Sequence, residues 1–357
     1  MLSLSESTYK FENKKTFQRV KSKKKIQIET KIINLNNQGG TPSKSEKSNS
    51  TKSNTLDQSS QLSSNTNQTK PAPTFIRPKL FQKQSISVLN SIYQQIINED
   101  NSNNYQDQQV PNFQKQKDIN EIHRGLVIDW LINVHLYFQL SEETLFLTVK
   151  LIDSFLARVE NFTKNNLQLL GLCSLLIASK YIESFHLNID NLVLLCEKAY
   201  SHSQIINFEK KLLFILDYTI IQDNLLNFFD LLSMIFKFDT KDYYLGKFLL
   251  ELTLLDTSFN CYKRTLIALS ASYLVMKIHI QKHPDYKQCL LYVKEAKCSE
   301  NDMKFVGKKI LVLMNNVKSS GFYCSCYQKY LDKIKEDSVE NDENMMMVFE
   351  KEEGTYY

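Results

Sequence analysis

Proline and glycine are almost missing from the middle of this 357-residue chain, and that depletion limits the folds open to it. The 172 residues between Pro111 and Pro284 contain no proline and three glycines, Gly125, Gly171 and Gly246. Proline breaks helix interiors, whereas turn-rich β folds need glycine and proline at their turns. We therefore predict an all-α body that is long enough to bury two cores of helix-bundle size.

Apolar residues recur at helical spacing along this body and predict two groups of five helices. Polar joints separate the helices, and Ser141 followed by Glu143 and Thr144 is typical of a helix N-terminus. A further helix is predicted at about 85–99, before the body begins. The first group covers about 122–138, 142–159, 164–183, 188–197 and 202–217, and the second about 223–236, 241–256, 263–281, 286–297 and 300–317.

The two groups share a weak sequence echo. LIDSFL (151–156) and LCSLLIASK (172–180) in the first half parallel LLDTSF (254–259) and LSASYLVMK (269–277) in the second. This echo predicts two copies of one five-helix unit. The expected order is a tail at 1–84, an N-terminal helix and linker at 85–117, a first helical domain at 118–221, a second at 222–334 and an acidic tail at 335–357.

Charge is spread unevenly along the chain. Residues 1–80 contain 15 Lys/Arg against 5 Asp/Glu, a net of +10, and the remainder contains 29 against 34, a net of −5. From Thr41 to Lys70, 21 of 30 residues are Ser, Thr, Asn or Gln and none is aromatic. Such a stretch cannot bury enough apolar surface to order itself, so we predict a disordered basic tail. The mildly acidic body argues against nucleic-acid binding, which requires a cationic face.

Several classes of protein find no support in the sequence. There is no glycine-rich phosphate loop or HExxH motif, and the six histidines are scattered, so we do not expect an enzyme. Cys324 and Cys326 are separated by one residue, which is not zinc spacing, and we expect no metal and no other cofactor. The N-terminus lacks a signal pattern, and no stretch reaches the ~18 apolar residues of a membrane span. We expect an intracellular protein that has no membrane partner.

Four charged residues interrupt apolar helical lines. Arg124 and Asp153 fall on such lines in the first two helices, and a charge placed there is expensive to desolvate unless it is paired. We predict that these two pair and hold their helices in register. Lys180 ends the apolar third helix and Glu209 interrupts the stripe of the fifth. Each lies at the edge of an apolar surface, where a partner could bind it, and this position favours a partner over an intramolecular pair for these two residues.

Three segments of the first half stand out: HRGLVIDWLINVHLYFQLSEETLFLTVKLIDSFL (123–156), LQLLGLCSLLIASKYIES (167–184) and INFEKKLLFILDYTI (206–220). They resemble the cyclin box, most closely that of A/B-type (mitotic) cyclins. FLLELTLLD (248–256), followed by LIALSASYLVMKI, resembles the second repeat of that group, and QKYLD (328–332) its tyrosine-containing tail motif. The five positions on which cyclin boxes are built all match: Arg124, Asp153, Leu169, Lys180 and Glu209. The resemblance implies two tandem cyclin boxes.

This resemblance implies a regulatory subunit that binds and allosterically activates a cyclin-dependent kinase in cell-cycle control, without a catalytic group of its own. Lys180 and Glu209 match a Lys and a Glu that, in cyclins, face the kinase. The resemblance implies that they bind it by charge-assisted hydrogen bonds. Two residues depart from the family pattern. The usual pair of acids after the aromatic is Ile182-Glu183 in this chain, and Ser184 stands where an aliphatic residue is usual. The other implied kinase contacts are Tyr181, Leu213, Tyr218, Ile220 and, on the N-terminal helix, Ile92.

The resemblance also implies a patch that docks substrates or inhibitors. Its matching residues are His123, Leu126, Val127, Trp130, Leu167 and Gln168. His123, Gly125 and Asn133 replace the Met, the Ala and the acidic residue of the family, which implies weaker recognition of an arginine in a docking motif. Trp130 is equally consistent with ordinary core. However, the first helix has two adjacent apolar lines, which is more than one core needs.

Three segments of the tail are candidates for regulation. Arg77–Leu80 (RPKL) has the R-x-x-L form of a mitotic destruction box, which would recruit a ubiquitin ligase, or it is simply linker. Thr41, followed by Pro42, fits a proline-directed kinase site whose phosphate would oppose the tail's positive charge. The lysine run at 21–25 is an import signal or a solvated run. We expect the protein in the nucleus and the cytoplasm.

A second interpretation belongs to a different class of protein. The chain could be a cyclin-fold scaffold or a transcription-type factor that does not activate a kinase, and the basic tail permits this. The presence of both Lys180 and Glu209 favours the kinase interpretation.

Overall fold

The computed structural model describes residues 86–102, 110–220, 225–279, 281, 283–284, 286–320 and 324–334. Within these residues every regular element is an α-helix or a 3₁₀ turn, which confirms the all-α prediction. The α-helices are α2 (Ile86–Ser102), α3 (Glu121–Tyr137), α4 (Glu142–Arg158), α5 (Leu167–Ile182), α6 (Ile189–Leu195), α7 (His202–Ile215), α8 (Leu225–Ile235), α9 (Thr240–Thr253), α10 (Arg264–Ile278), α11 (Cys289–Glu295), α12 (Glu300–Ser320) and α13 (Cys324–Ile334).

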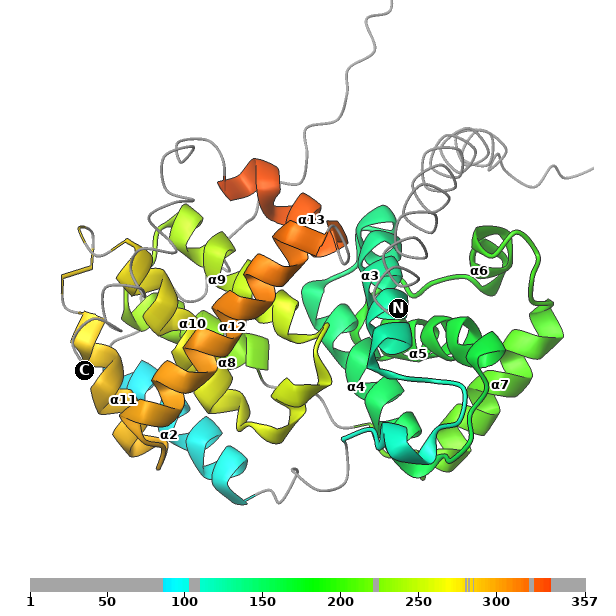
Figure 1. Cartoon of the computed structure of the whole chain (residues 1–357), viewed down its shortest axis with the longest axis horizontal. Helices are drawn as coiled ribbons and strands as arrows, with labels where there is room; N and C mark the ends of the chain where they lie inside the picture. The colour runs from blue at the N-terminus through cyan, green and yellow to red at the C-terminus, as the bar shows by residue number, and fades with distance from the viewer. Residues whose placement is uncertain are drawn as a thin grey trace, which may run out of the picture. The chain divides into compact units, whose positions relative to one another are not determined.

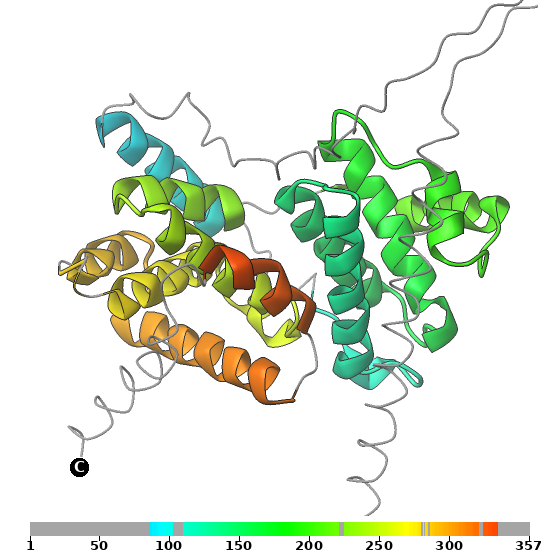
Figure 2. The same cartoon turned by 90° about the horizontal axis from the view of Figure 1, so that it is seen from above.

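The first bundle is built from α3 to α7 around the apolar helix α5 (Figures 1 and 2). Helices α3, α4 and α7 pack against α5, and every residue from Leu167 to Ser179 except Gln168 is buried. Gly171 allows α3 to approach closely, because a Cβ added there would lie 3.0 Å from Cγ1 of Val127. A helix with neighbours on several sides needs apolar residues nearly all the way round, as its sequence has.

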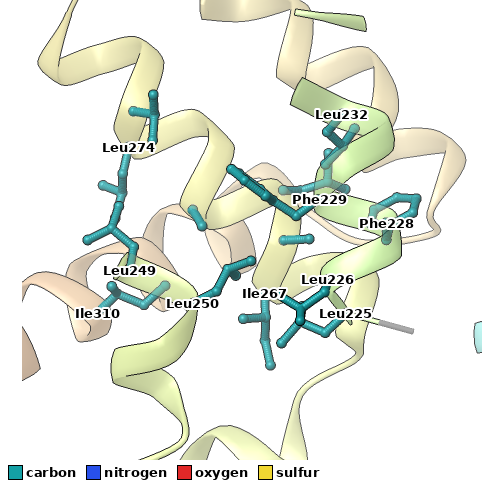
Figure 3. Packing of buried hydrophobic residues seen from close by; sticks show 14 of the residues in the cluster. Leu225, Leu226, Phe228, Phe229, Leu232, Leu249, Leu250, Ile267, Leu274 and Ile310 are labelled. Atoms are coloured by element: carbon teal, nitrogen blue, oxygen red, sulfur yellow. The ribbon is translucent and has the colours of Figure 1, made fainter. Parts of the chain in front are cut away.

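The second bundle repeats this plan with α8 to α12 around α10. Helices α8, α9, α11 and α12 pack against α10, and its residues from Thr265 to Lys277 are buried. Figure 3 shows part of the core, where Phe229 of α8, Leu250 of α9 and Ile267 of α10 are among the buried residues. The N-terminal helix α2 packs against α8 and α10. Two copies of a five-helix unit, preceded by a helix, are therefore present as predicted.

Helices α3 and α4 also contribute to the core of the second bundle. Ile128 and Ile132 of α3, with Leu145, Phe146 and Val149 of α4, belong to the same cluster of buried residues as α8 to α12. The remaining core of the first bundle forms a separate cluster around α5 and α7. The two bundles are thus joined through apolar side chains of α3 and α4.

The structure corrects two predicted helix limits and adds one helix. The helix predicted from residue 164 begins as a 3₁₀ turn, Lys164–Asn166, and becomes α-helical at Leu167. The helix predicted from 286 likewise begins with a 3₁₀ turn, Tyr286–Gln288. At the first of these starts, the side-chain amide of Asn166 donates to the hydroxyl of Thr163 (3.0 Å) and does not cap the α-helix. Helix α13 was not predicted, because its charged residues and two cysteines do not resemble a core helix; it packs against α9 and α3.

Candidate partner-binding surface

Lys180 and Glu209 bond to each other across α5 and α7. Lys180 lies in the last turn of α5, where the negative end of the helix dipole favours a cation. Its Nζ is 2.6 Å from Oε1 of Glu209, and the two side chains are 40% and 12% exposed. From the sequence, such an intramolecular pair was the less favoured expectation for these two residues, and the structure forms it. The bond accounts for a charge within the apolar stripe of α7, and it leaves the lysine accessible from outside.

Apolar and aromatic residues follow each member of this pair in the sequence. Tyr181 follows Lys180 and is exposed, whereas Leu213 and Ile220 are half-buried against the first core. Tyr218 is 68% exposed and adopts a left-handed backbone conformation (φ 55°) just after α7 ends. Its backbone N–H donates to the carbonyl of Leu213, which fixes this turn. The structure therefore places these four predicted contact residues on α5, on α7 and on the turn after α7.

Ile92 belongs to a different environment from the other predicted contact residues. It lies on α2, is half-buried and packs against the core of the second bundle. The helices against which α2 packs are α8 and α10. The structure shows no contact that brings Ile92 together with Lys180 or Glu209.

Two exposed phenylalanines were missed by the sequence analysis. Phe214 on α7 is 71% exposed, and Phe185 in the loop after α5 is 92% exposed. Phe214 lies one position beyond Leu213, outside the apolar stripe of α7. Phe185 lies in a loop, where no periodicity distinguishes a buried from an exposed apolar residue. Only Phe214 could have been noticed, as an apolar residue outside the core line of its helix.

The loop that carries Phe185 is fixed at both ends. The carboxylate of Glu183 accepts hydrogen bonds from the backbone N–H of Ser141 (2.7 Å) and from the hydroxyl of Thr144 (2.5 Å). On the other side, the N–H of Leu187 donates to Oγ of Ser179 (3.3 Å), and the Leu187 side chain is buried. Glu183 is thus engaged inside the chain, at the start of α4, rather than offered to a partner.

Arg124 and Asp153 form a buried, two-bonded ion pair between α3 and α4. Nε and Nη2 of Arg124 each donate to one carboxylate oxygen of Asp153 at 2.6 Å. Nη1 of Arg124 donates to the carbonyl of Leu254 (2.7 Å), and Asn260 donates to Asp153 (2.7 Å). Leu254 and Asn260 belong to the second bundle, so the pair joins the bundles as well as two helices. Leu169 is buried in the first core.

The predicted docking residues lie on α3 and at the start of α5. Leu167 is buried, and the other five are half-buried; Val127 and Trp130 pack against the first core. His123 completes the N-terminal capping box of α3 with Asn120. Partial burial and nearby Lys164 lower the pKa of His123. Five of the six residues are therefore partly accessible, whereas Leu167 is covered by the core.

Asn133 is an exposed residue that bonds to α13. Its amide donates to Oγ of Ser325 (2.5 Å), and the backbone N–H of Ser325 donates to Asp129 (2.8 Å). These bonds place the first turn of α13 beside α3, one turn from Trp130. The position at which the family has an acid therefore supports the C-terminal helix in this chain.

A buried network of charges attaches α13 to α9 and α4. Lys329 bonds to Glu251, and the hydroxyl of Tyr330 bonds to both Glu251 (3.0 Å) and Glu142 (3.1 Å). Lys247 bonds to Glu142 and to Asp230, each at 3.1 Å. Burial alone would raise the pKa of Glu142, but Lys247 and Lys329 outweigh it and lower that pKa to about 2. Burial raises the pKa of Glu251.

Several expectations lie outside this surface. Among the described residues, no helix is long and apolar enough to cross a membrane, and no group of three potential metal ligands occurs. The tail candidates Thr41, Arg77 and Leu80, and the lysine run at 21–25, fall outside the residues that the structure describes.

Two tandem five-helix bundles, each built around a buried central helix, define the class of this helical protein. Comparison with known proteins identifies the family. Residues 91–221 match the family described as the N-terminal domain of cyclin, and residues 224–341 match the C-terminal domain of cyclin. Together these matches cover well over half of the chain, which therefore belongs to the cyclin family. The resemblance found in the sequence is confirmed.

Mitotic cyclins are among the relatives. The chain is 34% identical over 206 residues to "G2/mitotic-specific cyclin-B" of Marthasterias glacialis, covering 58% of this chain and 52% of that protein. It is 36% identical over 178 residues to "G2/mitotic-specific cyclin-B2" of Homo sapiens, covering 50% of this chain and 44% of that protein. The chain thus spans about half the length of the curated relatives it matches. These names agree with the A/B-type resemblance.

A solved structure shares the fold. The chain is similar to a viral cyclin from Herpesvirus saimiri, with a TM-score of 0.53 and 17% sequence identity. The match covers 65% of this chain and 99% of the viral one.

Proposed function

We propose that this cyclin binds and allosterically activates a cyclin-dependent protein kinase in the control of mitosis. The observation that supports the proposal most is the Lys180–Glu209 pair, a partly exposed ion pair with exposed Tyr181 beside it. An exposed aromatic side chain beside a partly exposed ion pair fits an interface that has an apolar centre and a polar rim. The names of the mitotic relatives support the cell-cycle role.

In this proposal the pair binds polar groups of the kinase. The ammonium of Lys180 has hydrogens to donate beyond its bond to Glu209, and Glu209 has a second carboxylate oxygen that can accept. Both can therefore bind backbone groups of a partner without breaking their mutual bond. Charge-assisted hydrogen bonds of this kind are short and strong, and they fix the orientation of the partner.

Activation follows from differential binding. A partner that alternates between inactive and active conformations shifts toward the one that the cyclin binds more tightly, by as much as the two affinities differ. Exposed Tyr181 and Tyr218, with half-buried Leu213 and Ile220, supply apolar area that only a shaped partner surface can cover. The proposal assigns no catalytic group to this chain.

Further roles belong to the same proposal. The residues of α3 and early α5 would dock substrates or inhibitors, with little preference for arginine because Asn133 already bonds to Ser325. Arg77–Leu80 would recruit a ubiquitin ligase, and Thr41 would be phosphorylated by a proline-directed kinase. The nucleus and the cytoplasm are the proposed locations.

The proposal is tested by a pull-down from dividing cells, followed by an assay of protein-kinase activity. We expect the wild-type chain to recover kinase activity and Lys180→Ala/Glu209→Ala to lose at least about nine-tenths of it, because both polar anchors are gone. The matched control is Lys115→Ala/Glu160→Ala, which removes an ion pair of 2.7 Å that is 58% exposed on both sides. The control should keep its activity.

Two outcomes would contradict the proposal. Equal activity with wild type and the Lys180/Glu209 variant would place the interface elsewhere. Absence of a kinase from every sample would favour the scaffold function instead. Thermal unfolding of each variant ensures that a lost interaction is not a lost fold.

A further inference from the structure

Helix α12 exposes one face that is partly apolar. The exposed side chains of this face follow one another at helical spacing, and they are Asn301, Phe305, Lys308, Val312 and Asn316. Phe305 is 61% exposed and Val312 is 49% exposed. Helices α9, α10, α11 and α13 pack against α12, but they leave both of these apolar side chains open to solvent. We call this set of residues the outer face of α12.

The outer face of α12 lies on a positively charged helix. Residues 303–320 contain four lysines and no acid. Lys304 bonds to Glu300 of the first turn (2.9 Å), and Lys308 is exposed between the two apolar side chains. Lys309 lies over two aromatic rings, a contact that leaves its charge in place. A second copy of this face would bring like charges together, which disfavours self-association of the chain through α12.

The chain contains a segment whose composition is complementary to the outer face of α12. Residues 335–357 follow α13 and lie outside the described residues, and they contain eight Asp/Glu against two Lys, a net of −6. Within this acidic segment five consecutive residues are apolar, MMMVF (345–349), and acids stand on both sides of the run. Segments that stay solvated are usually poor in apolar residues, so the run indicates a contact. Methionine side chains adapt to irregular apolar surfaces.

The acidic segment is attached close to α12. Helix α13 packs against α12, and the two helices are neighbours in Figures 1 and 2. The ten residues 335–344 separate α13 from the apolar run, and they span up to about 33 Å when extended. Helix α12, with 21 residues, is about 32 Å long. Because a short tether keeps the local concentration of the run high, even a weak contact with α12 forms within one chain.

We infer that residues 345–353 dock onto the outer face of α12 in the same chain. In this contact the MMMVF run covers Phe305 and Val312, and the three acids that follow the run face Lys308 and Lys309. While docked, the segment excludes other acidic, apolar segments from this face. The contact involves no residue of the Lys180–Glu209 surface, so its test is separate from that of the proposed function.

The test places a photoreactive aromatic residue on the outer face of α12 in the full chain. In Phe305→p-benzoylphenylalanine, near-ultraviolet light joins the new side chain to C–H groups in contact with it, and mass spectrometry identifies the joined residues. We expect products with residues 345–353, at a yield at least about fivefold above that of Leu291→p-benzoylphenylalanine. Leu291 is the matched control, because it is 63% exposed on α11 of the same bundle. Lys308→Glu should lower the yield by about threefold or more, whereas Lys210→Glu, on exposed α7 surface, should not.

A mixture of unlabelled chains and chains labelled with heavy nitrogen shows whether a product joins one chain or two. Products within one chain support the inference, whereas products between two chains, or with another protein, would overturn it. Equal yields from positions 305 and 291 would also overturn it, and so would a yield that Lys308→Glu leaves unchanged. Because Phe305 and Lys308 are exposed, their variants should melt at the wild-type temperature, and melting curves verify this.

Discussion

His135 is a single buried residue whose protonation is coupled to folding. Its Nε2 lies 2.8 Å from the carbonyl oxygen of Ser141 and must therefore carry a hydrogen to donate. Its Nδ1 is buried and makes no hydrogen bond. Burial, helped by the nearby charge of Lys329, lowers the pKa of His135 to about 4. The folded chain thus holds this imidazole neutral at a pH where the unfolded chain protonates it.

We predict that the free energy of unfolding falls as the pH drops from about 6.5 to about 5, because the unfolded state then binds a proton that the folded state refuses. A pKa lowered from 6.5 to about 4 is worth about 3 kcal/mol over the whole window, and about 2 kcal/mol by pH 5. Urea unfolding followed by circular dichroism measures it. His135→Gln should flatten this part of the pH dependence, whereas His202→Gln, an exposed control on α7, should not. Equal slopes in both variants would contradict the prediction.

Some residues of the candidate site could be predicted from the sequence and others could not. Lys180 and Glu209 could be selected because a charge on an apolar line is costly, and that criterion requires only helical spacing. Their mutual bond was only the less favoured alternative, since whether it forms depends on how α5 and α7 cross. Phe185 was missed because exposure in a loop leaves no periodic trace. Lys329 and Glu251 look like solvated charges until α13 is packed onto α9.

At the scale of helices, Gly246 determines how closely α9 can approach α8. A Cβ added to Gly246 would lie 2.0 Å from Cζ of Phe229, which is fully buried. A Cβ added to Gly307 of α12 would meet Leu274 only at 3.4 Å, an ordinary contact. Both glycines lie within helices, so the intrinsic helix preference for alanine is the same at both and only the packing differs.

We therefore predict opposite effects from the same substitution. Gly246→Ala should lower the free energy of unfolding by about 1–3 kcal/mol, because Phe229 must move inside a packed core. Gly307→Ala should leave it unchanged or raise it by up to about 1 kcal/mol through helix propensity. Thermal unfolding of the two variants side by side measures the difference. If Gly246→Ala is as stable as Gly307→Ala, α9 is not held against Phe229.

Most helices of the fold could be predicted from the sequence. The lack of proline and the apolar spacing predicted all helices of the two bundles, since both signals are local. The starts at Leu167 and Cys289 were placed a few residues early, because a 3₁₀ turn and an α-helix share the same polar start signals. Helix α13 contains the QKYLD segment but has no apolar stripe of its own to announce a helix, and its position depends on long-range partners on α3, α4 and α9.

For the molecule as a whole, Arg124 connects the two bundles. It bonds to Asp153 within the first bundle and to the carbonyl of Leu254 in the second. We predict that Arg124→Ala lowers the free energy of unfolding by about 3–5 kcal/mol, because it leaves the buried carboxylate of Asp153 without its counter-charge. It should also weaken the coupling of the bundles, since a bond that spans both is lost.

The single tryptophan allows this coupling to be measured. Trp130 lies on α3 and reports on the first bundle through its fluorescence, whereas circular dichroism reports on all helices. The two signals should change together in the wild-type chain and separate in Arg124→Ala. Lys115→Ala/Glu160→Ala, which removes a solvent-exposed ion pair, should stay within about 0.5 kcal/mol of wild type. Coincident transitions in Arg124→Ala would mean that the shared apolar core couples the bundles unaided.

The buried network around Tyr330 has a consequence for the making of the chain. Ser325 bonds to a residue 196 positions earlier, and Tyr330 to Glu142, 188 positions earlier. Because a ribosome synthesises the chain from its N-terminus, nearly two hundred further residues are added after Asp129 and Glu142 before their partners Ser325 and Tyr330 emerge. During that interval the nascent first bundle keeps part of α3 and the start of α4 uncovered, a surface on which a chaperone can act. A chain whose synthesis stops before residue 324 would keep this surface of α3 and α4 uncovered.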